Sequence, residues 1–325
     1  MESKFKQCIM LTGAGARISQ EVAIIDQLIQ RKGLIIDQQD TMLAGFSSGG
    51  LNLMAINGCF RSENPMPWND YYKEEILWPL TTANVYTPSK VKPPIFDTAP
   101  LRNLLNTVLD AMGFQWMGDL PFDSYVLTYS ERQFATKWAN NFLFNTTNNR
   151  SLNCSDLFMA SASIPIVFGH QEIGNKAGEP RNFPGGKFND GGTIGQFKRF
   201  GEHIGLYVHD HEPFETIHII SPMRQAPDES ELNSLDEHQG ILKKFSANML
   251  FKAFYKFLEE VQEWQEANGP LANEVLVSIP RMSETFPMLK FDEQKKQYEK
   301  TSEWFDANPE QLAVPLKAFL DTHQV

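Results

Sequence analysis

The sequence predicts an α/β/α fold in which a central, largely parallel sheet lies between layers of helices. Apolar segments typical of buried strands alternate with segments of helical periodicity over the first 58 residues. Strands and helices in this order form parallel strand pairs joined by right-handed crossovers. The chain has 325 residues, of which 42% are hydrophobic and 21% are charged. This composition is typical of a globular protein and excludes disordered, collagen-like and coiled-coil chains.

The opening unit contains two strand-turn-helix repeats. Its expected elements are a strand over 7–12, a helix from Ile18 that stops at Gly33, a strand over 42–44 and a helix over 51–58. A glycine-rich turn follows each strand. Because both strands would run in the same direction, we expect both turns to lie at the same edge of the sheet.

Residues 61–100 differ from the regions on either side. Seven of the 19 prolines fall here, together with aromatic residues at 68, 71, 72, 78 and 86. Proline interrupts regular hydrogen-bond ladders, so we expect a long irregular insertion at about 61–100. Its large aromatic side chains either cover a pocket or anchor the insertion to the core, and anchoring is the simpler interpretation.

Regular patterns return after residue 100, and we expect one domain over 1–325 with a helical C-terminal part from about 240. The elements expected here are a helix over 101–112, strands over 125–129 and 134–144 that could pair, a helix end over 157–162, a core strand over 216–220 and a long amphipathic helix over 242–264.

Charge and cysteine content exclude several classes of function. The net charge is −11, which argues against nucleic acid as the main partner, because phosphate binding needs a basic surface. The three cysteines are far apart and form no CxxC pair, so neither a disulfide framework nor a structural zinc site is indicated. The N-terminus lacks a signal-peptide pattern, and no apolar run is long enough to span a membrane. We therefore expect a cytoplasmic protein, with export independent of a signal as the alternative.

The strongest candidate for a catalytic group is Ser47. It is the central residue of a G-x-S-x-G pattern, with Gly45 and Gly49 at its ends, between a predicted strand and a predicted helix. A serine on such a sharp turn needs small neighbours, and the helix N-terminus behind it directs N–H groups toward a developing negative charge. The alternative is a glycine-rich turn that only packs a helix on the sheet.

A serine nucleophile needs a base, and two kinds of base are available. None of the seven histidines lies in a convincing catalytic loop: His218 falls inside a predicted strand, and the His209–His211 pair lacks a third metal ligand. Asp190 is followed by Gly191 and Gly192. This pattern is that of an ordinary turn, but a carboxylate held beside Ser47 could also take its proton directly.

The turn after the first strand is a candidate oxyanion hole. It consists of Gly13, Ala14, Gly15, Ala16 and Arg17, and it leads into a helix. Successive backbone N–H groups in such a turn form a cavity that binds anions. Arg17 could stiffen this loop by bonding to carbonyl groups, or it could offer positive charge to a phosphate.

Together these segments resemble the patatin-like phospholipase family. The resemblance rests on the glycine-rich segment 13–17, the elbow 45–49 and the Asp-Gly-Gly segment 190–192, in this order. Residues 160–165 (ASASIP) and 291–305 also look like segments of that family. The sequence departs from the family pattern at Ala14 and Ile18, where glycines are usual, and at Phe46 and Ser48, which flank the nucleophile. Phe46 is a candidate for shaping an acyl pocket.

The resemblance implies a three-layer α/β/α patatin-like fold and a lipid acyl hydrolase. In that family's scheme, Ser47 attacks the ester carbonyl, Asp190 acts as base and then as acid, and amides of the glycine-rich loop hold the oxyanion. No metal or other cofactor is implied. The implied substrate is a phospholipid or lysophospholipid, with a peripheral membrane contact. A helix around 243–256 could provide that contact, although packing on the core is the simpler interpretation of its aromatic residues.

Three other interpretations stay open. The Gly13-x-Gly15 turn also fits a dinucleotide-binding fingerprint with Asp37, but Ile18 stands where its third glycine belongs. A histidine-dependent α/β-hydrolase is the second, and it would need more strands before Ser47. The third is a catalytically inert lipid-binding or regulatory module of the same fold. Head-group, chain-length and positional specificity, acyl transfer, an activator and the oligomeric state are not indicated by the sequence.

Overall fold

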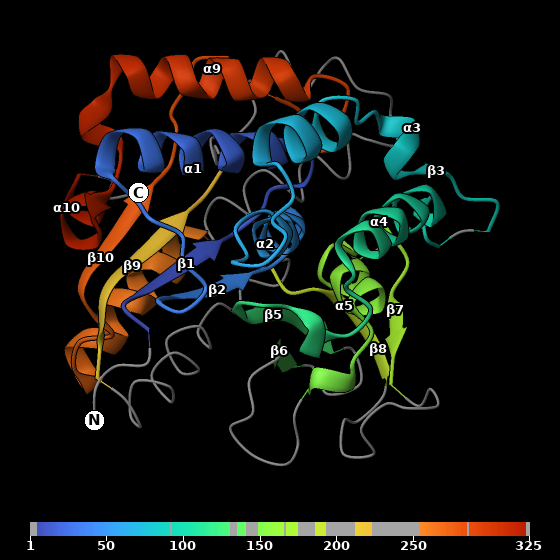
Figure 1. The fold of residues 1–325 in the computed structure, drawn as a ribbon, viewed down its shortest axis with the longest axis horizontal. Helices are drawn as coiled ribbons and strands as arrows, with labels where there is room; N and C mark the ends of the chain where they lie inside the picture. The colour runs from blue at the N-terminus through green and yellow to red at the C-terminus, as the bar shows by residue number, and fades with distance from the viewer. Residues whose placement is uncertain are drawn as a thin grey trace.

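The computed structural model describes residues 5–91, 93–130, 135–140, 149–165, 167–174, 186–192, 212–222, 254–284 and 286–322. Nine strands of these segments form one sheet, in the order β11-β10-β9-β1-β2-β5-β8-β7, with β6 also paired to β5 (Figure 1). The strands of this sheet are β1 (Gln7–Leu11), β2 (Thr41–Gly45), β5 (Asp123–Ser130), β6 (Ala135–Asn140), β7 (Gln171–Ile173), β8 (Gly186–Asp190), β9 (Phe214–Ile220), β10 (Ala272–Ser278) and β11 (Val314–Pro315).

The centre of the sheet is parallel and its outer pairs are antiparallel. Strands β10, β9, β1, β2 and β5 all run in the same direction. Leu11, the last residue of β1, is opposite Gly45 on β2 and Ile220 on β9. The carboxyl ends of these strands therefore lie at one level, which is where ligands bind in open α/β sheets.

Helices cover both faces of the sheet, which confirms the predicted α/β/α layers. One face packs against α1 (Ile18–Lys32), α2 (Ser48–Cys59), α4 (Ala99–Met112) and α5 (Cys154–Ser161), and α9 (Gln294–Ala307) lies alongside α1 on its outer side (Figure 1). The other face packs against helical residues 254–268 and α10 (Leu316–Asp321). Ile9 and Leu11 belong to the first core and Cys8 and Met10 to the second, as the alternation of a strand requires.

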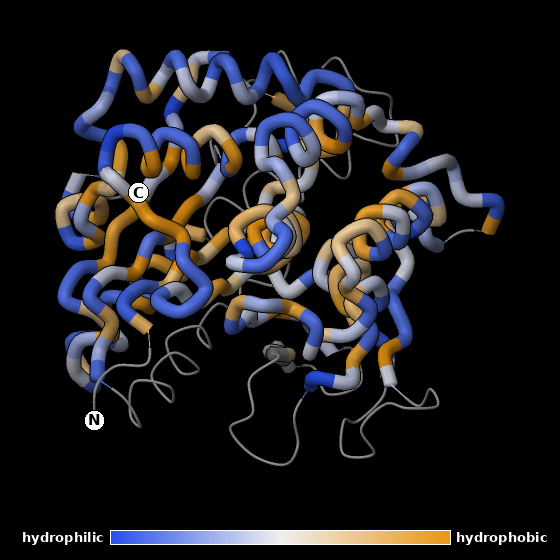
Figure 2. Tube along the Cα trace, in the orientation of Figure 1, coloured by the Kyte–Doolittle hydropathy of each residue, from blue (hydrophilic) through white to orange (hydrophobic). Residues whose placement is uncertain are grey.

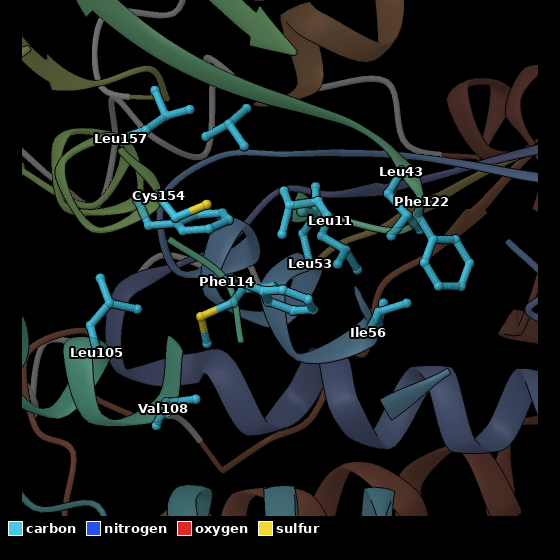
Figure 3. Close-up of a cluster of buried hydrophobic side chains, with 14 of the residues drawn as sticks. Leu11, Leu43, Leu53, Ile56, Leu105, Val108, Phe114, Phe122, Cys154 and Leu157 are labelled. Atoms are coloured by element: carbon cyan, nitrogen blue, oxygen red, sulfur yellow. The ribbon is translucent and has the colours of Figure 1, made fainter. Parts of the chain in front are cut away.

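The larger of the two cores joins the elements that carry the candidate site. Leu11 and Leu43 of the central strands belong to one cluster with Leu53 of α2, Leu105 of α4 and Leu157 of α5 (Figure 3). The central strands and the inward sides of these helices are the most hydrophobic segments, whereas α9 is largely hydrophilic (Figure 2). The first turns of α2 and the end of α5 are thus anchored to one rigid body.

The insertion at 61–100 is more regular than its prolines suggest. It contains a π-helix, η2 (Trp68–Leu77), a short α3 (Thr82–Val85) and a small hairpin of β3 (Thr87–Pro88) and β4 (Phe96–Asp97). The expectation of an irregular segment is therefore wrong over 68–77. Its prolines lie outside η2, and Pro67 stands directly before the first helical residue, where the missing N–H costs nothing.

The aromatic residues of this insertion anchor it to the core. Tyr72 is buried, and its ring stacks on Trp68 at 5.1 Å between ring centroids. The Trp68 indole donates a hydrogen bond of 2.8 Å to Asp26 on α1. Asp26 also accepts from buried Lys73 at 2.5 Å and from the Tyr298 hydroxyl of α9 at 2.6 Å. One buried carboxylate therefore ties the insertion, α1 and α9 together.

Most elements expected after residue 100 are present with shifted bounds. The helix over 101–112 begins two residues earlier as α4, and the expected strands at 125 and 134 are β5 and β6, which pair antiparallel. Residues 134 and 141–144 of the second expected strand lie outside the described residues. The helix end over 157–162 is α5, and the core strand over 216–220 is the longer β9.

The sequence predicts a helical C-terminal part from about residue 240, but the structure contains strands there as well as helices. Strands β10 and β11 add to the sheet there. Residues 242–253 of the expected amphipathic helix lie outside the described residues, and 254–268 are helical. Phe254 and Phe257 are fully buried against the sheet, so the expectation that these two rings could face a bilayer is wrong. Across the described ranges, no helix combines the length and apolar character needed to cross a membrane.

The histidine on the central strand β9 makes folding sensitive to pH. His218 is buried between Ile9 of β1 and Leu276 of β10, and its Nδ1 has no hydrogen-bond partner among the described residues. Burial lowers the pKa of His218 to about 4 from the ordinary value of 6.5. The unfolded chain therefore binds a proton between these values that the folded protein excludes.

We expect this histidine to weaken the fold under acidic conditions. The free energy of unfolding should be highest above about pH 6.5 and fall by up to about 3 kcal/mol as the pH drops to about 4. Urea denaturation across this range should show a steeper fall for the wild type than for His218→Leu, because the carboxylates titrate in both proteins. Equal slopes would contradict a neutral, buried His218.

Candidate active site

Ser47 lies in a strained turn between β2 and α2, as the sequence predicts. Its backbone has φ 55° and ψ −139°, a conformation that non-glycine residues rarely adopt. The flanking glycines make close backbone contacts, and only glycine fits at Gly49. A Cβ on Gly45 would lie 3.1 Å from the carbonyl oxygen of Gly49, and a Cβ on Gly49 would lie 2.3 Å from that of Leu11. The serine side chain is 9% exposed, at the carboxyl edge of the sheet.

The glycine-rich loop after β1 packs directly against this turn. Gly13 has φ +58°, and a Cβ there would lie 2.6 Å from the amide nitrogen of Gly49 and 2.8 Å from that of Ser48. The loop backbone therefore contacts the first turn of α2. Gly15 also has φ +58°, and its Cβ would lie 2.4 Å from the carbonyl oxygen of Met288.

Four of the five predicted oxyanion-hole amides have acceptors inside the protein. The amide of Gly13 donates to Glu21 Oε1 at 2.7 Å, and that of Ala14 donates to Ser48 Oγ at 3.0 Å. The amides of Ala16 and Arg17 donate to the carbonyl oxygens of Met288 and Ala14, at 2.7 and 3.2 Å. Gly15 is the loop residue whose amide has no acceptor within the described segments.

Arg17 stiffens the loop, one of the two roles expected for it. Its side chain is buried, and Nε donates to the carbonyl oxygen of Phe286 at 2.6 Å. This contact joins the glycine-rich loop to the C-terminal part of the chain.

Two further polar residues of the loop environment were not expected from the sequence. Glu21, fully buried in the first turn of α1, accepts from Gly13 N–H and, through Oε2, from Asn52 Nδ2 at 2.7 Å. Asn52 in turn accepts from the Tyr72 hydroxyl at 2.6 Å. Burial raises the pKa of Tyr72 well above its ordinary value, which keeps its hydroxyl a donor. A carboxylate in the first turn of a helix is a weak signal that could have pointed to Glu21.

The sheet brings Asp190 to the carboxyl end of β2. One edge of β5 pairs with β6 over residues 125–130. The other edge pairs with β2 as far as Val126 and with β8 from Thr128, which is opposite Asp190. Strands β2 and β8 thus follow each other along one edge of β5. Asp190, 3% exposed, lies where β2 ends and the turn containing Ser47 begins.

The end of α5 holds both candidate catalytic residues by their backbones. The amide of Ser47 donates to the carbonyl oxygen and the hydroxyl of Ser161, at 3.0 and 3.1 Å. The amide of Asp190 donates to the carbonyl oxygen of Ser163 at 2.9 Å. The Ser161 hydroxyl donates to the carbonyl oxygen of Leu127 on β5 at 2.7 Å. The segment 160–165 therefore links the nucleophile turn, the acid turn and β5.

The acid turn also contacts the nucleophile turn directly. The Asp190 carboxylate accepts from the amide of Gly192 through Oδ1 at 2.8 Å. A Cβ on Gly192 would lie 2.6 Å from the ring of Phe46, and one on Gly191 would lie 2.7 Å from the carbonyl oxygen of Leu127. Phe46 is 2% exposed and packs in the second core. Its ring fills the space beside Gly192, so its role in an acyl pocket stays a prediction.

The remaining candidates are placed only in part. His170 is exposed just before β7, and the other histidines except His218 lie outside the described residues, including His209 and His211. No group of three or more metal-ligating side chains occurs in the segments that the structure describes.

The two adjacent glycines of α2 give a matched test of the elbow. We expect Gly49→Ala to lower the free energy of unfolding by at least about 2 kcal/mol, because its Cβ would collide with the Leu11 carbonyl. Gly50→Ala should be neutral or slightly stabilising, since its Cβ would lie 3.6 Å from the nearest atom and alanine favours helix. Thermal unfolding of both variants measures the two changes in stability. Equal losses of stability would contradict the close contact between Gly49 and the Leu11 carbonyl group.

Comparison with known proteins identifies the family. The model of the family described as patatin-like phospholipase matches residues 9–197, which include every predicted site residue from Gly13 to Gly192. Among solved structures, VipD from Legionella pneumophila is similar at 12% sequence identity and a TM-score of 0.36, over 94% of this chain and 67% of that one. This likeness is too distant to bear on the activity. Curated protein sequences gave no match. The family match covers more than half of the chain, and this protein therefore belongs to the patatin-like phospholipase family.

Proposed function

We propose that this protein hydrolyses carboxylic esters of lipids, with Ser47 as the nucleophile and Asp190 as its base. One observation carries the proposal: β2 and β8 share one edge of β5, so the strained serine and the buried carboxylate lie at the same point of the sheet. Membership of the patatin-like phospholipase family supports lipid acyl hydrolysis in general.

The reaction follows from the roles of these groups. Ser47 Oγ attacks the ester carbonyl carbon while the Asp190 carboxylate takes the hydroxyl proton. The tetrahedral intermediate then expels the alcohol, which receives that proton from Asp190, and leaves an acyl group on Ser47. A water molecule, deprotonated by Asp190, attacks the acyl group and releases the carboxylic acid. The proton returns to Ser47, so the enzyme is regenerated.

Backbone amides would stabilise the negative charge of the intermediate. In the first turn of α2, the amide of Gly50 donates to the carbonyl oxygen of Ser47, whereas those of Ser48 and Gly49 have no acceptor among the described residues. Gly15 supplies the loop amide without an acceptor in the described part of the protein. Glu21, Ser48 and Met288 hold the neighbouring amides, so these groups shape the loop and Gly15 donates to the oxyanion.

A phospholipid or lysophospholipid is the proposed substrate class, because the matching family is described as patatin-like phospholipase. Such a substrate requires a peripheral contact with a lipid surface. The proposal commits to no head group, acyl length or ester position.

Replacement of either catalytic group should abolish hydrolysis without loss of the fold. We expect Ser47→Ala to lower turnover by about 10³-fold or more and Asp190→Asn by about 10²–10⁴-fold, because an amide cannot take the serine proton. The measurement is hydrolysis of nitrophenyl esters of graded acyl length and of mixed phospholipid vesicles. The exposed substitutions Ser62→Ala and Asp110→Asn are matched controls that should keep wild-type rates.

Each contrary result has a distinct meaning. Near-wild-type turnover of Asp190→Asn would show that Asp190 is not the base, and the seven histidines should then be replaced in turn. Loss of activity in both control variants would show that the lower rates result from damage to the fold and not from removal of a catalytic group.

An inert lipid-binding module is the second candidate. It is favoured by the Ala14 amide, which donates to Ser48 Oγ instead of facing an oxyanion. A fluorophosphonate probe distinguishes the two functions. Labelling of wild type but not of Ser47→Ala supports the hydrolase, whereas folded wild type that stays unlabelled supports the inert module.

A further inference from the structure

The carbonyl group of Ala16, in the glycine-rich loop, accepts two hydrogen bonds from α9. Gln294 Nε2 and Gln297 Nε2 donate to it at 2.9 and 3.1 Å. Both glutamines are 1% exposed, and they lie three residues apart on the same side of the helix. Burying two side-chain amides is unfavourable unless they are hydrogen-bonded, so packing alone would favour apolar residues at these positions.

Other contacts fix the first of these amides in place. The Ser19 hydroxyl donates to Gln294 Oε1 at 2.5 Å, and Gln294 Nε2 also donates to the carbonyl oxygen of Phe291 at 3.2 Å. The carboxamide of Gln294 is thereby held at both ends, with its nitrogen directed at Ala16.

The segment just before α9 holds the same loop from its backbone. The Met288 carbonyl oxygen accepts from the amide of Ala16 at 2.7 Å, and it approaches Gly15 so closely that only glycine fits there. The Phe286 carbonyl oxygen accepts from Arg17 Nε. Both hydrogen-bonding groups of Ala16 are thus bound to residues 286–297, which adjoin the proposed oxyanion donor Gly15.

The contacts at Ala16 are additional to those that hold α9 on α1. Farther along the same helix pair, Tyr298 donates to Asp26, and Asp306 accepts from Gln27 at 3.1 Å and pairs with Arg31. The helix pair is therefore held along its length without the two glutamines.

We propose that Gln294 and Gln297 are positioning residues of the active site, which hold Ala16 so that the Gly15 amide faces the oxyanion. The inference rests on the proposed hydrolase function. Residues 286–297 lie beyond the part of the chain that the family model matches. Under this proposal they position the loop that stabilises the oxyanion.

The test is a double-mutant cycle with Gln294→Leu, Gln297→Leu and the double variant. Each single variant leaves Ala16 one donor, whereas the double variant leaves a buried carbonyl with neither. We expect turnover of a nitrophenyl ester to fall about threefold in each single variant and about tenfold or more in the double variant, with KM within about twofold of wild type.

A second readout separates positioning from stability. An alkylboronic acid forms a tetrahedral anionic adduct with a serine nucleophile, so its inhibition constant reports oxyanion stabilisation. We expect this constant to rise in parallel with the loss of kcat/KM across the three variants. The matched control is Tyr298→Phe, which removes a hydrogen bond to α1 from the residue next to Gln297 and should leave kcat and the inhibition constant unchanged.

The outcomes separate this inference from the proposed function. If wild type hydrolyses esters and Ser47→Ala does not, but the folded glutamine variants keep wild-type kcat and boronate inhibition, the positioning role is wrong. An equal loss of kcat in Tyr298→Phe would also overturn it, because general loosening of α9 would then suffice. If the double variant does not fold, the single variants decide by the same two readouts. An inactive, unlabelled wild type contradicts the hydrolase itself.

Discussion

The site depends on the close approach of two backbone segments, the turn after β1 and the first turn of α2. Gly13 and Gly49 pack so closely that a methyl group on either would overlap the other segment's backbone. Parallel pairing of β1 with β2 brings the two turns to one level. Only glycines allow the turns to touch there, so the anion-binding loop and the nucleophile are neighbours as a consequence of sheet geometry.

Antiparallel pairing of β8 with β5 brings Asp190 to the same end of the sheet as the two turns. Strand β8 is antiparallel to β5 and begins to pair just beyond the last residue of β5 that pairs with β2. The end of α5 then binds the backbones of Ser47 and Asp190 through Ser161 and Ser163. The relative position of nucleophile and acid is therefore set by backbone hydrogen bonds, which are stiffer than contacts between long side chains.

The C-terminal part of the chain completes this arrangement from outside the sheet. Buried polar groups on α9 and the residues before it bind Ala16 and Arg17. A buried carbonyl oxygen that loses its donors is costly, so such contacts select one arrangement of the loop over its alternatives. The loop that faces the reaction is in this way supported by segments from both ends of the sequence.

The sequence by itself determined the α/β layers, the turns at Gly13–Arg17 and Gly45–Gly49 and the candidates Ser47 and Asp190. These follow from local patterns, because hydrophobic period and glycine placement depend on near neighbours. Tertiary structure alone decided the π-helix at 68–77, the strands β10 and β11, and the partners of Glu21, Gln294 and Gln297. A polar residue inside a helix carries no sign of its distant partner, and a strand such as β10 or the short edge strand β11 gains its stability from the sheet it joins. Which loop amides have internal acceptors was likewise settled by packing, since it depends on where Ser48 and Met288 come to lie.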